Sequence, residues 1–135
     1  MSLEINNLTN FAVDKKSFAQ VAKKVLLGEN RETETLSLVF VSREEIKKLN
    51  KKFRKKNRAT DVLSFNLNEP KHLGEIVICP DVVKENARKI GVSAKSETMK
   101  VFIHGILHLL GYDHEKDAQA NIMEAKQNLY LSSIK

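Results

Sequence analysis

Three histidines stand close together in the last third of the chain, at His104, His108 and His114, and Gly111 lies between the second and the third. Residues four apart share one face of an α-helix, so the first pair predicts a helix with both imidazole rings on one side. Gly111 can adopt a positive φ angle and end that helix sharply, which would turn the chain back and bring His114 to the same point. The local fold around residues 104–114 is therefore narrowly constrained.

Three neutral imidazoles around one point are suited to bind a metal ion, because a ring nitrogen coordinates Zn²⁺ at about 2.0–2.1 Å. Three protein ligands with a fourth position open are typical of a catalytic zinc site rather than a closed structural one. We therefore expect one Zn²⁺ ion per chain, bound by His104, His108 and His114. A cluster of packed histidines without a metal is the alternative, and only one other histidine, His72, occurs in the chain.

The motif differs at one position from that of a large class of zinc proteases. Metzincins carry H-E-x-x-H-x-x-G-x-x-H, in which the glutamate is the general base. Gly105 occupies that position here, so peptide hydrolysis by the usual route would lack its proton acceptor. Asp113 is the nearest carboxylate in the motif, and it is a candidate either to orient a ligand histidine or to serve as the base.

The positive charge of the chain is concentrated in one segment. The formal net charge is +6, from 23 basic and 17 acidic residues. Residues 43–58 hold nine basic and two acidic side chains, a net charge of +7, which leaves −1 for all other residues. A basic stripe of this kind favours a negatively charged partner such as a nucleic-acid backbone, although a solvated helix face would have the same composition.

Length and composition restrict the class of protein. A chain of 135 residues, 41% hydrophobic and 30% charged, is expected to fold as one domain over residues 1–135 and is not typical of disordered or collagen-like proteins. No apolar stretch approaches the roughly 20 residues needed to span a bilayer, and the first residues do not resemble a secretory signal. Cys79 is the only cysteine, so an intrachain disulfide is impossible, and we expect a cytoplasmic protein.

Hydrophobic periodicity predicts an α+β fold. Ser42 and Glu45 form a capping box for a helix whose thin apolar face comprises Ile46, Leu49 and Phe53. Strands are expected at residues 3–8, 34–41, 60–67 and 72–79, and helices at 14–27, 42–53, 80–90, 93–110 and 115–134. These elements do not alternate strictly, which favours about four strands in a mixed sheet packed with about five helices.

Three segments of the chain carry motifs of one known family. The histidine segment 104–114 is similar to the signature H-G-x-L-H-L-x-G-Y-D-H. Residues 50–54 and 59–65 resemble N-x-x-[FY]-R and P-T-[DN]-V-L-S-F, and residues 73–79 resemble the strand L-G-D-I-x-I. Together these motifs resemble the YbeY family of bacterial rRNA-maturation endoribonucleases. Two positions depart from the family pattern: Ala59 replaces a proline and Glu75 replaces an aspartate.

The resemblance implies a zincin-like hydrolase that cleaves single-stranded RNA, with roles in maturing the 3′ end of 16S rRNA and in ribosome quality control. It implies that His114 and Arg54 belong to the catalytic site and that Arg54 contacts a substrate phosphate. The expected partners are the 16S rRNA precursor and the small ribosomal subunit, and neither a membrane nor DNA is expected. The attacking oxygen could come from water or from the RNA 2′-hydroxyl.

The other basic residues of the stripe are expected to bind the RNA backbone without sequence preference. They are Lys47, Lys48, Lys51, Lys52, Lys55, Lys56 and Arg58. Two other functions remain open at this point: a metal-dependent hydrolase of another substrate, including peptides, and a non-catalytic ribosome-binding module that zinc stabilises.

Overall fold

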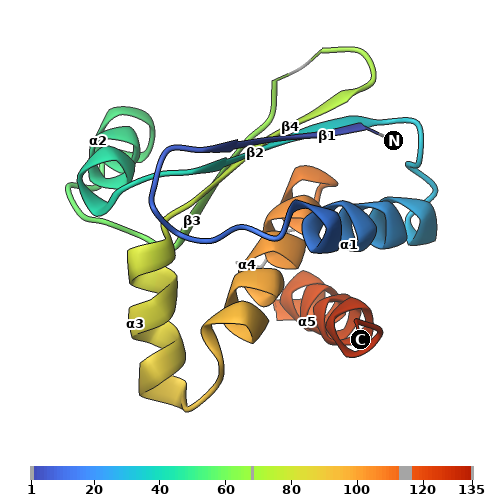
Figure 1. The fold of residues 1–135 in the computed structure, drawn as a ribbon. Coiled ribbons are helices and arrows are strands. Elements are labelled where there is room, and N and C mark those ends of the chain that lie inside the picture. The colour runs from blue at the N-terminus through green and yellow to red at the C-terminus, as the bar shows by residue number, and fades with distance from the viewer. Residues whose placement is uncertain (1, 68, 113–116, 135) are drawn as a thin grey trace.

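The computed structural model of the chain describes residues 2–67, 69–112 and 117–134. Its elements, in order, are β1 (Ser2–Asn7), α1 (Lys15–Gly28), β2 (Thr35–Phe40), α2 (Arg43–Arg54), β3 (Val62–Phe65), β4 (His72–Ile78), α3 (Pro80–Ile90), α4 (Ala94–Leu109) and α5 (Asp117–Ser132) (Figure 1). This order confirms the predicted α+β class, and every predicted element lies within two residues of its expected bounds.

The four strands form one mixed sheet in the order β1-β2-β4-β3. β1, β2 and β4 are parallel, with Leu38 of β2 paired to Ile5 on one side and to Ile76 on the other. β3 lies at the edge and runs antiparallel to β4, with Leu63 opposite Val77. The mixed sheet was thus predicted correctly.

The two faces of the sheet are covered by different helices (Figure 1). Leu36, Leu38 and Phe40 alternate along β2 and are almost fully buried in the main core, where they meet residues of α1 and α4. On the opposite face a smaller cluster joins Val77 of β4 to Ile46 of α2. The sheet therefore separates α2 from α4.

The helix bounds follow from local capping. The Ser42 hydroxyl accepts a hydrogen bond of 3.2 Å from the backbone N–H of Glu45, as the capping box predicts. α2 ends where Lys55 adopts a left-handed conformation with φ of 58°, and its backbone N–H bonds to the carbonyl of Lys51 at 3.1 Å. Gly91 ends α3 with φ of 75°.

Large apolar side chains are exposed on two helices. Phe53, assigned to the apolar face of its helix, lies in the last turn of α2 and is 55% exposed, although one side of its ring packs on Phe65 of β3. Ile122 and Leu129 of α5 are also exposed, since that helix packs through Met123 and Tyr130 instead. Within the described part of the chain, no helix has the length and apolar character needed to cross a membrane.

Candidate functional site

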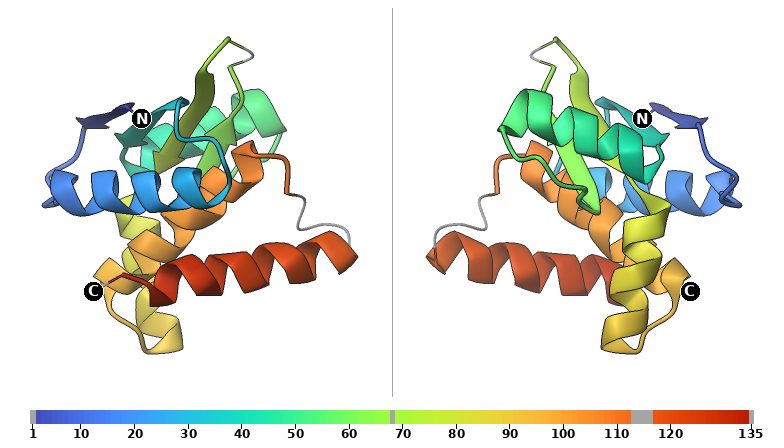
Figure 2. Two further views of the ribbon diagram at one scale, coloured as in Figure 1. Left: turned by 90° about the vertical axis from the view of Figure 1, so that its right-hand side faces the viewer. Right: turned by 90° about the vertical axis from the view of Figure 1, so that its left-hand side faces the viewer.

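His104 and His108 lie one turn apart on α4, as predicted, and both are half-buried. The helix that carries them is fixed by apolar packing, since Phe102, Ile103 and Ile106 are completely buried in the main core. α4 packs against β3 and β4 on one side and against α5 on the other (Figure 2). The backbone beneath the two imidazole rings is therefore held from several directions.

Gly105 allows α4 to approach the sheet closely. A Cβ atom at this position would lie 3.1 Å from Cγ2 of Ile76 and 3.2 Å from Oγ of Ser64, which is tighter than ordinary packing. The Ser64 hydroxyl donates a long hydrogen bond of 3.5 Å to the carbonyl of Gly105. A larger side chain would therefore require Ile76 or Ser64 to shift by a few tenths of an ångström. The glycine at the position of the metzincin general base thus allows the close packing of α4 on β3 and β4.

The ring of His104 is oriented by α5. Its Nδ1 lies 3.0 Å from Oε1 of Gln127, whose side chain is only 7% exposed. An amide oxygen accepts hydrogen bonds, so this contact favours the tautomer with the proton on Nδ1 and the lone pair on Nε2. Histidines that bind metals commonly donate their other ring N–H in this way. The donor set on α4 therefore fits a divalent cation, and Gln127 is a residue that the sequence motifs did not reveal.

α4 ends as the sequence predicted. Gly111 has φ of 105°, a conformation that glycine adopts without strain. Asp113 and His114 lie outside the described residues, so the proposed third ligand and the proposed base stay predictions. Among residues 2–67, 69–112 and 117–134, no group of three or more histidine, cysteine, aspartate or glutamate side chains is arranged to hold a metal.

A buried carboxylate fixes the chain directly after α4. Glu29 accepts hydrogen bonds from the hydroxyls of Tyr112 at 2.6 Å and Tyr130 at 2.5 Å, and from Nζ of Lys126 at 2.9 Å. Burial alone would raise the pKa of Glu29, but these three donors outweigh it and hold the pKa below its ordinary value of 4.5. Burial and the Glu29 carboxylate in turn raise the pKa of Tyr130 to about 12. The ionised carboxylate thereby joins α1, α5 and the segment that follows α4.

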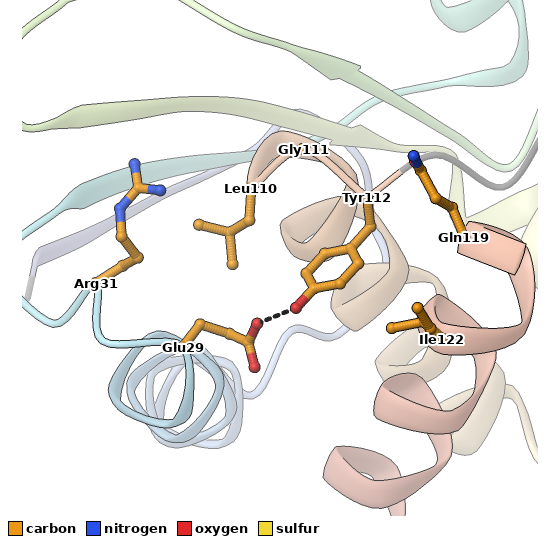
Figure 3. Close-up of a pocket in the computed structure, with 7 residues that line it drawn as sticks. All are labelled: Glu29, Arg31, Leu110, Gly111, Tyr112, Gln119 and Ile122. Atoms are coloured by element: carbon orange, nitrogen blue, oxygen red, sulfur yellow. Dashed lines mark hydrogen bonds between the residues drawn. The ribbon is translucent and has the colours of Figure 1, made fainter.

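Figure 3 shows this arrangement around Tyr112, whose hydroxyl points to Glu29 at the end of α1. A cavity of about 310 Å³ lies beside it. Its lining comprises Glu29, Arg31, Leu110, Gly111, Tyr112, Gln119 and Ile122. No motif marked Glu29, because its three partners are 83 to 101 residues away in the sequence.

The basic stripe is exposed on and after α2. Arg54 is the last residue of the helix, and its side chain is open to solvent. The predicted RNA-contact residues Lys47, Lys48, Lys51, Lys52, Lys55, Lys56 and Arg58 are exposed as well. In the described part of the chain, no ion pair involves any of these eight side chains. Their charges are thus available to a partner from outside.

The loop after α2 is anchored by a buried amide. Asn50 is 3% exposed, and its Nδ2 donates a hydrogen bond of 2.9 Å to the carbonyl of Arg58. The carbonyl of Asn50 accepts a bond of 3.3 Å from the backbone N–H of Lys56. Asn50 belongs to the N-x-x-[FY]-R motif, and its role here is to hold the basic loop against α2.

The edge strand β3 connects the end of α2 to α4. On one face of β3, the ring of Phe65 packs edge to face against Phe53, with ring centroids 5.3 Å apart. On the other face, Ser64 contacts Gly105, which lies between the two histidines of α4. The end of α2, next to Arg54, and the histidine helix α4 therefore pack on opposite faces of the same short strand.

Comparison with known proteins gives one consistent family. The family described as Endoribonuclease YbeY matches residues 4–135. Endoribonuclease YbeY of Thermotoga maritima is 46% identical over 100 residues, which cover 73% of this chain and 67% of that protein. The Staphylococcus carnosus protein of the same name is 36% identical over 140 residues, covering 96% of this chain and 84% of its own length.

A solved structure has the same fold. The solution structure of a Thermotoga maritima protein superimposes with a TM-score of 0.73 at 36% sequence identity. The match covers 98% of this chain and 88% of the other. The similarity therefore extends beyond the three motifs to the terminal elements.

Proposed function

The chain belongs to the family of the endoribonuclease YbeY, and from this premise we propose that it cleaves single-stranded RNA with one Zn²⁺ ion bound by His104, His108 and His114. As a member of the family it is an endoribonuclease. The proposed substrate is the 16S rRNA precursor near its 3′ end, cleaved in the cytoplasm in association with the small ribosomal subunit as part of rRNA maturation and ribosome quality control.

The observation that carries the metal proposal is the pair of half-buried histidines on α4, one of them oriented by Gln127. When bound, Zn²⁺ supplies Lewis-acid chemistry, because it polarises a phosphoryl oxygen and makes a water molecule more acidic. The chain supplies the geometry: α4 fixes the two imidazoles, and the tautomer of His104 leaves its Nε2 lone pair for the cation.

Arg54 is proposed to stabilise the negative charge that develops on the phosphate during cleavage. Its guanidinium presents a planar set of donors that matches phosphate oxygens. Arg54 directly follows Phe53, which packs on one face of the edge strand β3, while α4 contacts the other face of that strand. The lysines and Arg58 would hold the RNA backbone on either side. Asp113 would orient a ligand histidine or accept a proton.

Peptide hydrolysis by the metzincin route is disfavoured because Gly105 stands where those proteases carry the general-base glutamate. The close contact of Gly105 with Ile76 and Ser64 favours a small residue at this position. What stays open is whether the metal takes part in cleavage or only stabilises the fold, and the experiment below distinguishes the two.

The test is a cleavage assay on labelled single-stranded RNA with wild-type protein, His108→Ala, His114→Ala, Arg54→Glu and the control Arg58→Glu. We expect wild type to cut the RNA and to contain one zinc ion per chain, and the histidine variants to lose both. Arg54→Glu should keep zinc and lose cleavage, whereas Arg58→Glu should weaken binding and keep the chemistry. Intact RNA with pure, zinc-loaded wild type would refute the proposed zinc-dependent cleavage, and cleavage by a histidine variant that contains no zinc would show that the metal only stabilises the fold.

The same assay identifies the attacking oxygen. Attack by the 2′-hydroxyl leaves a 2′,3′-cyclic phosphate on the upstream product, whereas attack by water leaves a linear phosphate. Mass spectrometry of the products separates the two, and RNA with a 2′-deoxynucleotide at the cleavage site is cut only by the water route.

A further inference from the structure

The end of α2 exposes an aromatic ring within the basic stripe. Phe53 is 55% exposed although it is one of the largest apolar side chains in the protein. It directly precedes Arg54, and Nζ of Lys52 lies 5.2 Å from the centroid of its ring. Because this patch is cationic and aromatic at once, it differs from an isolated exposed apolar residue elsewhere on the surface.

The ring is also held in place. Phe53 packs edge to face on Phe65 of β3, with an interplanar angle of 66°. Phe65 is itself half-buried beneath α2, where it packs against the cluster around Ile46. The ring is thus held by Phe65 along one side, and Lys52 lies over it, yet Phe53 keeps 55% of its surface exposed. A base can stack on it once the flexible Lys52 side chain moves aside to a phosphate, and the ring itself loses little conformational freedom on binding.

We propose that Phe53 is a base-stacking site, on which one unpaired base of the RNA substrate lies while the neighbouring cationic side chains contact its phosphates. This inference rests on the proposed function and adds the site that distinguishes single-stranded from double-stranded RNA. Stacking on aromatic side chains is tolerant of sequence because every base has a π face. In a duplex that face is covered by neighbouring bases, so this patch discriminates against double-stranded RNA.

The position of the patch relates the stacked base to the proposed cleavage site. Phe53 lies against one face of β3, and α4 with its histidines lies against the other face of the same strand. β3 is the edge of the sheet, so a strand of RNA can pass around it from one face to the other. The stacked nucleotide is therefore expected within a few nucleotides of the scissile phosphate.

The test measures the dissociation constants of wild type and Phe53→Ala for an RNA of about 12 nucleotides and for a set in which each nucleotide in turn lacks its base. We expect Phe53→Ala to bind the intact RNA between about 5-fold and 100-fold more weakly. When the missing base is the one that stacks on Phe53, wild type should bind the abasic RNA as weakly as Phe53→Ala binds the intact RNA. Phe53→Ala itself should bind this abasic RNA and the intact RNA with the same affinity. A denaturing gel after each titration checks that the RNA is intact.

Two variants separate stacking from packing. Phe53→Tyr keeps the ring and should bind as wild type does, while Phe53→Leu keeps apolar contact with Phe65 and should bind as Phe53→Ala does. Ile90→Ala is the matched control, since Ile90 is 57% exposed on α3, away from the stripe. Thermal melts establish that all variants are folded.

The possible outcomes are distinct. Equal affinity of wild type and Phe53→Ala for the intact RNA overturns the stacking site and leaves the proposed function standing. A loss of affinity that is the same for every abasic RNA also overturns it, because the ring would then have no partner base. If wild type fails to bind single-stranded RNA at all, the proposed function and this inference fail together.

Discussion

Helices α4 and α2 lie on opposite faces of one sheet and are built in opposite ways. α4 buries ten of its sixteen residues, whereas α2 buries only two of its twelve. The histidines proposed to bind a metal are on the first, and the cations proposed to bind RNA are on the second. Ligands must be held within fractions of an ångström, whereas contacts to a charged backbone tolerate movement, so the two tasks need different amounts of burial.

The largest loss of stability is expected from a cavity made in the core beside α4. Ile106, which lies between His104 and His108 in the sequence, is completely buried in the main core. Ile106→Ala removes three carbon atoms from that core and should lower the free energy of unfolding by about 2–5 kcal/mol. Urea unfolding followed by circular dichroism measures this. Lys47→Ala on α2 is the control, with an expected change within about 0.5 kcal/mol. Equal changes in the free energy of unfolding for the two variants would show that α4 is no more important to the core than α2.

The next largest loss of stability is expected for replacement of the buried carboxylate of Glu29. Glu29→Gln leaves three donors facing an amide, so we expect a loss of about 1–3 kcal/mol at pH 7. Glu32→Gln, an exposed neighbour, is the matched control and should change little. Unfolding midpoints in urea measure both variants.

The pH dependence gives a separate test of the same residue. Because the pKa of Glu29 is lower in the folded chain than its ordinary value of 4.5, its contribution is complete above that value. It is lost as the pH falls from about 4.5 through the folded pKa. The difference in stability between wild type and Glu29→Gln should therefore shrink on acidification. A difference that stays constant from pH 7 to pH 3 would contradict the proposed ionised state.

The sequence was sufficient for features that depend on local periodicity. The helix with His104 and His108, the cap at Ser42 and the turn at Gly111 all follow from patterns within about ten residues. Gln127 and Glu29 could not be found in this way, because hydrogen bonds that cross 23 to 101 residues depend on how the helices pack. The exposure of Phe53 could not be found either, because periodicity defines a helix face but not how completely the neighbouring strand covers each residue on it.

On α2, the only buried residues are Ile46, which belongs to the core, and Asn50. Of the polar residues of this helix, Asn50 should therefore contribute most to stability. Asn50→Ala removes the hydrogen bond to the carbonyl of Arg58 and leaves that acceptor without its protein donor, at an expected cost of about 1–2 kcal/mol. RNA affinity should fall as well, since the loop with Lys55 and Lys56 loses its anchor. Asn57→Ala, in the exposed part of the same loop, is the control. If Asn50→Ala were as stable as wild type and bound RNA with the same affinity, the loop would not depend on this hydrogen bond.

The smallest effect on stability is expected for single lysines of the stripe. Lys48 is exposed and forms no ion pair with any described residue, so Lys48→Ala should leave the free energy of unfolding within about 0.5 kcal/mol of wild type. If Lys48 contacts a phosphate, the plot of log affinity against log salt concentration should become shallower by about 0.7, the value for one contact to a single strand.

The matched control for Lys48 is Lys23, an exposed lysine of α1 outside the stripe. Both substitutions remove one positive charge, so they change the net charge equally and differ only in position. A smaller salt dependence for Lys48→Ala alone would show that RNA contacts the surface of α2. Equal reductions for both would mean that the whole charge of the protein attracts RNA, and the concentration of basic residues on α2 would then have no special role in binding.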